Sequence, residues 1–117
     1  MEPAPIKPLV SLAQLEALDI RVGTIESVQG VAGSNKLARF VVDFGERRRT
    51  VLAGMKKERA DRGALVGAQT LFVVNLEPRE MAGMLSEAMF LDLGYADGIA
   101  PALAVPERSV PNGTRAG

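Results

Sequence analysis

The sequence predicts an all-β domain with minor helices, in which five short strands form a small barrel. Apolar and polar residues alternate with period two over residues 37–44, which is typical of a strand with one buried face. Other short apolar runs recur along the chain and are separated by turn residues, drawn from 12 Gly and 7 Pro. The 117 residues correspond to one domain that is long enough to bury its own core.

The first residues predict an arm followed by a short helix. Residues 1–10 contain three of the seven prolines and are expected to form a flexible or extended arm, because proline interrupts both helices and central strands. Ser11 then begins a helix, with Gln14 three residues later in the position of a capping box. Three leucines share one face of this helix: Leu12, Leu15 and Leu18. That face must cover either the domain's own core or a partner subunit.

Three strands are predicted in the first half of the domain. Residues 19–31 form a long strand, in which Gly23 indicates a bulge or a sharp bend. Residues 37–44 form the second strand. A tight charged turn leads into a third strand over residues 49–53, so the second and third strands are expected to pair as a hairpin.

A helical segment and further strands follow. Residues 55–65 favour a short, exposed helix or helical turn. Residues 71–74 are apolar throughout, which predicts a strand buried on both sides, and residues 88–93 form the fifth strand. A sixth strand over residues 99–105 is expected at a sheet edge, because Pro101 cannot donate a hydrogen bond.

Five strands with a helix between the third and the fourth are the pattern of an OB-fold, a small and partly open barrel. A barrel also pairs strand edges that would otherwise be exposed. A small sandwich or an SH3-like barrel would give a similar pattern, so strand spacing favours the OB-fold only slightly. We expect a single domain over residues 11–117, with an N-terminal helix and a C-terminal extension outside the barrel.

The absence of cysteine and histidine excludes several kinds of site. Zinc sites with the usual ligands are impossible, and so are Ser-His-Asp and Cys-His catalysis. We expect no metal, no cofactor and no catalytic residue, although an enzyme built on carboxylates, Lys, Ser and Tyr is chemically allowed. No apolar run approaches the roughly 18 residues of a membrane span, and the first residues lack a secretory signal pattern, so a cytoplasmic protein without a membrane partner is expected.

Charge is distributed unevenly along the chain, although 14 basic and 14 acidic residues give a net charge of zero. Residues 36–63 hold nine basic and four acidic residues, which gives this segment a charge of +5. The basic members are Lys36, Arg39, Arg47, Arg48, Arg49, Lys56, Lys57, Arg59 and Arg62. Such asymmetry indicates a basic surface that attracts a polyanion, and a solvated loop and helix face explains the same charges equally well.

The polar connector over residues 75–87, between the fourth and fifth strands, is the candidate binding site, because elaborate connectors between buried strands often bind ligands. In it Arg79 offers a planar set of donors to a phosphate, or pairs with Glu77 or Glu80 instead. The other candidate residues also have a structural alternative: Lys36 as a loop lysine, Asn75 as a turn former, Ser86 as a local cap and Met89 as core filler.

The aromatic residues are few and do not form a stacking platform. Phe40 and Phe44 lie on the apolar face of the second strand, so they are expected in the core. This favours readout of phosphate and shape in a folded RNA over stacking of single-stranded bases. The connector also contains the acids Glu77, Glu80 and Glu87, which oppose the binding of RNA.

Several motifs follow one another in the order found in a known family. They are LDIRVGTI at residues 18–25, NKL at 35–37, VVDFG at 41–45, VVNLEPREMAG at 73–83, SEAM at 86–89 and VPNGT at 110–114. Through these motifs, residues 15–115 resemble the tRNA-binding domain found at the C-terminus of many methionyl-tRNA synthetases. The same domain occurs in free-standing dimers, among them the CsaA-like secretion chaperones.

The resemblance implies an OB-fold that binds tRNA by structure, with little sequence preference, and that dimerises through elements outside the barrel. It places the family's binding residues at Lys36, Asn75, Pro78–Arg79, Ser86 and Met89. We therefore expect a non-catalytic tRNA-binding homodimer, with the leucine face and the C-terminal extension (residues 99–110 included) at the dimer interface. The alternative is a CsaA-like chaperone whose clients are unfolded or secretory polypeptides.

Overall fold

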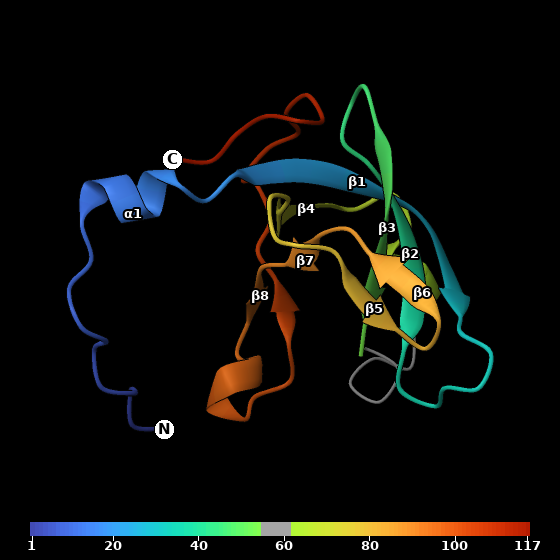
Figure 1. Cartoon of the computed structure of the whole chain (residues 1–117), viewed down its shortest axis with the longest axis horizontal. Helices are drawn as coiled ribbons and strands as arrows, with labels where there is room; N and C mark the ends of the chain where they lie inside the picture. Colours follow the sequence, from blue (N-terminus) through green and yellow to red (C-terminus); the bar gives the residue numbers. More distant parts are fainter. Residues whose placement is uncertain (55–61) are drawn as a thin grey trace.

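The computed structural model describes residues 1–54 and 62–117, and a five-stranded antiparallel sheet curled into a half-barrel forms its centre (Figure 1). The strands follow the order β3-β2-β1-β4-β7. Their bounds are β1 Ile20–Gly30, β2 Ala38–Asp43, β3 Arg48–Ala53, β4 Gln69–Val73 and β7 Met89–Phe90. The expected all-β class with an OB-type barrel and minor helices is confirmed.

Strand β1 organises the sheet, because it is long and bends. Its first half pairs with β4 and its second half pairs with β2. The register shifts between Ile25 and Ser27, which places a bulge there and not at Gly23. A Cβ on Gly23 would lie 2.5 Å from Val42 Cγ1 and 2.8 Å from the Phe44 ring, so this glycine is required by close packing over the core.

The core lies inside the curl, and alternate residues of β2 contribute to it. Ala38, Phe40 and Val42 of β2 have no exposed surface, as the period-two pattern predicts. Three ring contacts connect the walls, with centroid distances of 4.9 Å for Phe40–Phe90, 5.2 Å for Phe44–Phe72 and 4.6 Å for Phe72–Phe90. The expectation that Phe40 and Phe44 belong to the core is confirmed.

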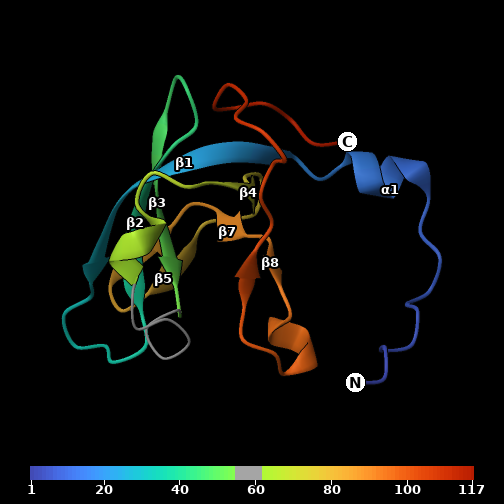
Figure 2. The ribbon, with the colours of Figure 1, turned by 180° about the vertical axis from the view of Figure 1, so that it is seen from behind.

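Helix α1 (Leu12–Glu16) lies beyond one end of the sheet, and residues 1–10 extend from it without a helix or strand (Figures 1 and 2). The predicted capping box is present, since Gln14 N donates to Ser11 Oγ at 3.1 Å and Ser11 N donates to Gln14 Oε1 at 2.7 Å. No residue of α1 is buried. The leucine face is therefore not packed in the core of this chain: Leu12, Leu15 and Leu18 are 69%, 55% and 46% exposed.

The strand expected over residues 88–93 is split in the structure. Strand β7 pairs with β4, whereas β8 (Asp92–Leu93) pairs with β9 (Ala102–Leu103) in a separate two-stranded sheet. A 3₁₀ turn, Tyr95–Asp97, connects these two short strands. Asp92 and Leu93 are both exposed, so the alternation of buried and exposed residues ends after Phe90. The chain leaves the barrel at this point. Strand β9 begins directly after Pro101 in this peripheral sheet, in agreement with the expected edge strand.

The segment expected to be helical, residues 55–65, is described only in part, because residues 55–61 lie outside the described residues. Its last turn, Arg62–Leu65, is a 3₁₀ turn that buries Leu65 in the core. In the described part of the chain, no helix has both the length and the apolar character needed to cross a membrane.

The C-terminal segment runs beside the first half of β1. Val22 N donates to Thr114 O at 2.9 Å and Ala116 N donates to Ile20 O at 2.8 Å. Its turn crosses the β2–β3 turn so closely that a Cβ on Gly113 would lie 2.5 Å from Phe44 O. Asn112 adds side-chain bonds to the barrel, accepting from Thr24 Oγ1 at 2.8 Å and from Gln69 Nε2 at 3.0 Å. The end of the chain is thus hydrogen-bonded along β1, although it is not one of the five strands of the sheet.

Candidate nucleic-acid interface

The connector between β4 and β7 folds as a hairpin of its own, made of β5 (Arg79–Met81) and β6 (Met84–Ser86). Its two-residue loop has φ of 51° at Ala82 and 79° at Gly83, the left-handed backbone of a type I′ turn. In the sequence, this hairpin is indicated only by the Ala82-Gly83 pair between Met81 and Met84. That pair is a weaker turn signal than the usual Asn-Gly. The hairpin was not predicted and appears only in the structure.

Two loops of an OB-fold commonly bind oligonucleotides: the one between its first and second strands and the one between its fourth and fifth. Here these loops are residues 31–37 and residues 74–88. The first loop carries Lys36 and the second carries Arg79, and both side chains are exposed. Among the described residues, neither side chain has an ion pair or a hydrogen bond, so the pairing of Arg79 with Glu77 or Glu80 is not formed. Both cations are available to a phosphate.

Ser86 occupies a different environment from its cross-strand neighbour Arg79. It is 8% exposed, accepts a hydrogen bond from Leu52 N at 3.0 Å and donates one to Ala88 O at 3.2 Å. Glu87 completes the same contact, since its N donates to Thr50 O and its Oε1 accepts from Thr50 N, both at 2.9 Å. We call these bonds between β3 and Ser86–Glu87 the closure seam, because they join the connector to the free edge of the barrel.

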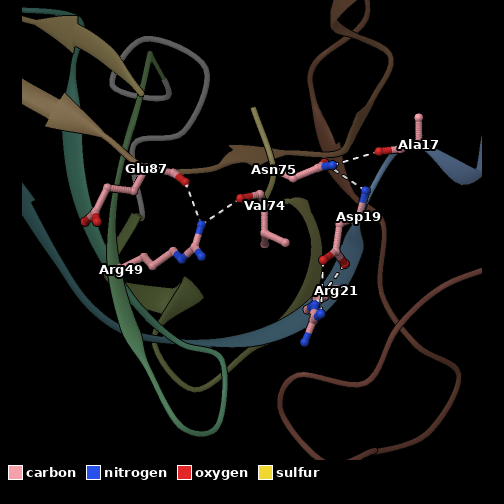
Figure 3. A network of polar contacts seen from close by, with 7 residues as sticks. All are labelled: Ala17, Asp19, Arg21, Arg49, Val74, Asn75 and Glu87. Atoms are coloured by element: carbon pink, nitrogen blue, oxygen red, sulfur yellow. Dashed lines mark hydrogen bonds and ion pairs between the residues drawn. The ribbon is translucent and has the colours of Figure 1, made fainter. Parts of the chain in front are cut away.

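Arg49 extends the closure seam across the end of the barrel (Figure 3). Its Nη1 donates to Val74 O at 2.7 Å and to Glu87 O at 3.2 Å. One guanidinium on β3 therefore holds both ends of the connector. Hydrogen bonds from a charged donor to carbonyl groups are among the stronger ones, so Arg49 stabilises the shape of the candidate site.

Asn75 also uses its side chain for structural contacts, as Figure 3 shows. Its Oδ1 accepts a hydrogen bond from Asp19 N at 2.8 Å and its Nδ2 donates one to Ala17 O at 2.7 Å. These contacts join the end of β4 to the chain between α1 and β1. The side-chain amide is therefore used across the fold and does not act as a simple turn former.

Asp19 forms an ion pair with Arg21 next to Asn75 (Figure 3). Arg21 Nε donates to Asp19 Oδ1 at 2.8 Å and Arg21 Nη2 donates to Oδ2 at 3.0 Å. This bidentate contact lowers the pKa of Asp19 below its ordinary value of 3.8, and it raises the pKa of Arg21. The pair is therefore charged and mutually neutralised at neutral pH.

Some basic side chains of residues 36–63 have a partner in the described part of the chain, and others have none. Residues 55–61, with three of its basic groups, lie outside the described residues. Arg48 pairs with Glu26, which raises the pKa of Arg48, and Arg39 donates to Gln29 at 3.3 Å. Arg47 is exposed, and its side chain has no partner in the described part of the chain. In the described part of this segment, Lys36 and Arg47 are thus available to a ligand, and Arg79 on the connector is a further available cation.

Apolar side chains are also exposed on the connector and on β7, which follows it. Met89 is 51% exposed on β7, Leu85 is 57% exposed on β6, and Leu76 is 42% exposed between β4 and β5. The reading of Met89 as core filler does not fit this exposure. No group of three or more potential metal-binding side chains occurs in residues 1–54 and 62–117.

Comparison with known proteins agrees with this geometry. The sequence profile of a family described as "Putative tRNA binding domain" matches residues 20–115. A methionine–tRNA ligase from Methanothrix thermoacetophila is 39% identical over 108 residues, which are 92% of this chain and 15% of the ligase. The chain therefore spans only about a seventh of that relative.

Two solved structures are similar over nearly the whole chain. A MetRS related protein from Pyrococcus horikoshii has a TM-score of 0.86 at 27% identity, covering 95% of this chain and 100% of its own. The chaperone CsaA from Bacillus anthracis str. Ames has a TM-score of 0.81 at 29% identity, covering 94% of this chain and 100% of its own. The resemblance inferred from the sequence motifs is confirmed.

Proposed function

The chain belongs to the tRNA-binding domain family, and from this premise we propose that it binds tRNA through the two loops at residues 31–37 and 74–88. The observation that carries the proposal is the family match over residues 20–115. Lys36 and Arg79 supply cations that have no partner among the described residues, on loops that OB-folds use for oligonucleotides. The four phenylalanine rings are buried in the core, and the exposed Tyr95 lies outside both loops. This combination favours contacts with phosphates and with the shape of a folded RNA.

The candidate residues divide into contacts and positioning residues in this proposal. Lys36 and Arg79 contact phosphates, and the exposed thioether of Met89 packs against a sugar or a base. Asn75 and Ser86 act on the site by holding it in place, because the hydrogen bonds described above already engage their polar atoms. No step of this function needs a catalytic residue, a metal or a cofactor, and we propose that it takes place in the cytoplasm.

A salt titration of tRNA binding tests this proposal. The affinity for total tRNA should exceed the affinity for an unstructured RNA strand of equal length, and it should fall as salt increases. Removing one phosphate contact reduces the salt slope by about 1. Lys36→Ala and Arg79→Ala should each show this reduction without a change in melting temperature, and the double variant should show both reductions together.

Arg108→Ala is the matched control, because Arg108 is exposed, pairs only with its neighbour Glu107 among the described residues and lies outside both loops. It should retain the wild-type affinity and salt slope. Equal affinity for tRNA and for an unstructured strand would refute structure-selective binding. Unchanged binding in the Lys36→Ala, Arg79→Ala double variant would remove the two loops as the site.

The second candidate function is a chaperone that holds unfolded or secretory polypeptides, and one observation favours it. The similar chaperone CsaA matches 94% of this chain, and the apolar residues Leu85 on the connector and Met89 on β7 are exposed. In this function the wild-type protein would suppress aggregation of an unfolded client. Leu85→Ser and Met89→Ser would reduce that activity, whereas Arg79→Ala would leave it unchanged.

We further propose that the protein acts as a homodimer through its N-terminal helix and C-terminal extension. Leu12, Leu15 and Leu18 line a hollow of about 860 Å³ with Arg115–Gly117 at the end of the chain, and the leucines are largely exposed. Light scattering at micromolar concentration should give twice the mass of the chain, and Leu15→Asp should give a monomer. A monomeric wild-type protein would refute the dimer.

A further inference from the structure

A second hollow lies at the end of the barrel where the β2–β3 turn, the start of β1 and the end of β4 meet. Its volume is about 640 Å³, within the range of small-molecule sites. Arg21, Arg47 and Arg49 line it, together with the acids Asp19 and Glu46. It is separate from the cations proposed for tRNA binding, since neither Lys36 nor Arg79 is among its lining residues.

Positive charge exceeds negative charge in this hollow once the neutral ion pair is set aside. Both carboxylate oxygens of Asp19 are bound by Arg21, so that pair contributes no net charge. Within the described residues, Arg49 is bound only to the carbonyl groups of Val74 and Glu87, through Nη1 (Figure 3). Its Nε and Nη2, like the whole Arg47 side chain, have no acceptor within the described residues. Two guanidinium groups thus face one free carboxylate, Glu46.

The wall of the hollow is held in one shape by two crossing turns. Gly45 and Gly113 both line it and have φ of 100° and 90°. A Cβ on Gly45 would lie 2.8 Å from Asn112 O, so the two backbones touch where they cross. Gly113 N also donates to Val22 O at 2.8 Å. The guanidinium groups of Arg47 and Arg49 are therefore carried beside a closely packed backbone, and a site that is already formed lowers the entropic cost of binding a ligand.

We propose that this hollow is a second anion site that binds a phosphate group through Arg47 and Arg49. The planar donor set of arginine matches the oxygen atoms of phosphate, and the unused Nε and Nη2 of Arg49 are adjacent donors in one fork. The site takes either a free phosphate or a phosphate of the RNA backbone. The RNA source rests on the proposed tRNA binding, whereas the free phosphate does not.

The first arm of the test uses inorganic phosphate alone. In ¹H–¹⁵N spectra of the full chain, the amides of Gly45, Asn112 and Gly113 should shift and saturate as phosphate is added in the millimolar range. Arg47→Ala should weaken this binding about tenfold, the loss of one charge-assisted contact. Glu46→Gln should strengthen it, because the opposing charge is removed. Arg108→Ala should leave it unchanged. Arg49 is not varied in this test, because its loss would also open the closure seam.

The second arm uses tRNA and separates the two sources. If the RNA backbone supplies the phosphate, Arg47→Ala should lower the salt slope of tRNA binding by about 1, in addition to the effect of Arg79→Ala. Shifts with phosphate and no change with tRNA would assign the site to a free phosphate. If phosphate causes no saturable shift and Arg47→Ala leaves the salt slope intact, the proposal is overturned. The proposed tRNA function would survive that result, because it depends on Lys36 and Arg79.

Discussion

Arg47 lies in the turn just before β3 and Arg49 lies within β3, two residues later, yet the fold uses them differently. Arg49 is half-buried and its guanidinium holds two backbone carbonyls of the connector, whereas Arg47 is exposed and has no side-chain partner in the described chain. The same division separates Ser86, which is buried in the closure seam, from Arg79 directly across the β5–β6 hairpin. Residues that look equally suited to bind a ligand thus serve stability in one case and are available for binding in the other.

The comparison shows which substitutions can test ligand binding without also changing the stability of the fold. A variant in the closure seam lowers the free energy of unfolding, because a backbone group loses its hydrogen-bond partner. A variant of a free cation changes charge alone. Each of the following predictions tests this distinction, beginning with the largest expected effect.

Arg49→Ala should destabilise the protein by about 3 kcal/mol, because two backbone carbonyls lose a charged donor. Arg47→Ala, the matched control, should leave the free energy of unfolding unchanged within about 0.5 kcal/mol. Urea unfolding followed by circular dichroism measures both values. Equal stability of the two variants would contradict the division between an engaged and a free arginine.

Ser86→Ala should cost about 2 kcal/mol, because the buried Leu52 N loses its acceptor. The hydroxyl itself contacts no ligand in the proposed function, so the tRNA affinity of the folded variant should stay within about threefold of wild type. Ser109→Ala is a suitable control, since Ser109 is exposed. A variant with wild-type stability and strongly reduced tRNA binding would instead make Ser86 a direct contact.

The Asp19–Arg21 pair should make only a small contribution to the free energy of unfolding, because 39% of the Arg21 side chain and 32% of the Asp19 side chain are exposed to solvent. The folded-state pKa of Asp19 is lowered, so its contribution is present above the unfolded value near 3.8 and is lost as pH falls through the folded value. The difference in unfolding free energy between wild type and Asp19→Asn should therefore shrink as the pH is lowered below about 4. A difference that does not vary with pH would exclude this cause.

Ala82→Asn should give the smallest effect and the opposite sign. Ala82 has φ of 51°, which costs an alanine about 1 kcal/mol, and an Asn-Gly pair suits the type I′ turn. Stability should rise by about 0.5 kcal/mol. Because the hairpin carries Arg79 without burying it, tRNA affinity should not fall. A loss of affinity in this more stable variant would mean that the hairpin must change shape on binding.

Much of the local structure could be predicted from residues close together in the chain. The alternation over residues 37–44 placed Phe40 and Phe44 in the core, and Ser11 with Gln14 predicted a capping box that the structure contains. Lys36 and Arg79 were placed on the two loops where they lie, because loop positions follow from the strands on either side. These features depend on backbone preference and on the period of burial, which act over a few residues.

The roles of single polar residues depended on contacts between distant parts of the chain. Asn75 meets Ala17 across 58 positions, and Ser86 meets Leu52 across 34. The end of the strand expected over residues 88–93 was decided by its pairing with Ala102–Leu103. Local pattern indicates that a residue is polar and lies in a loop, but it carries no information on which backbone group will need a partner after the barrel closes. That need arises only in the folded state, where a buried amide or carbonyl must be satisfied.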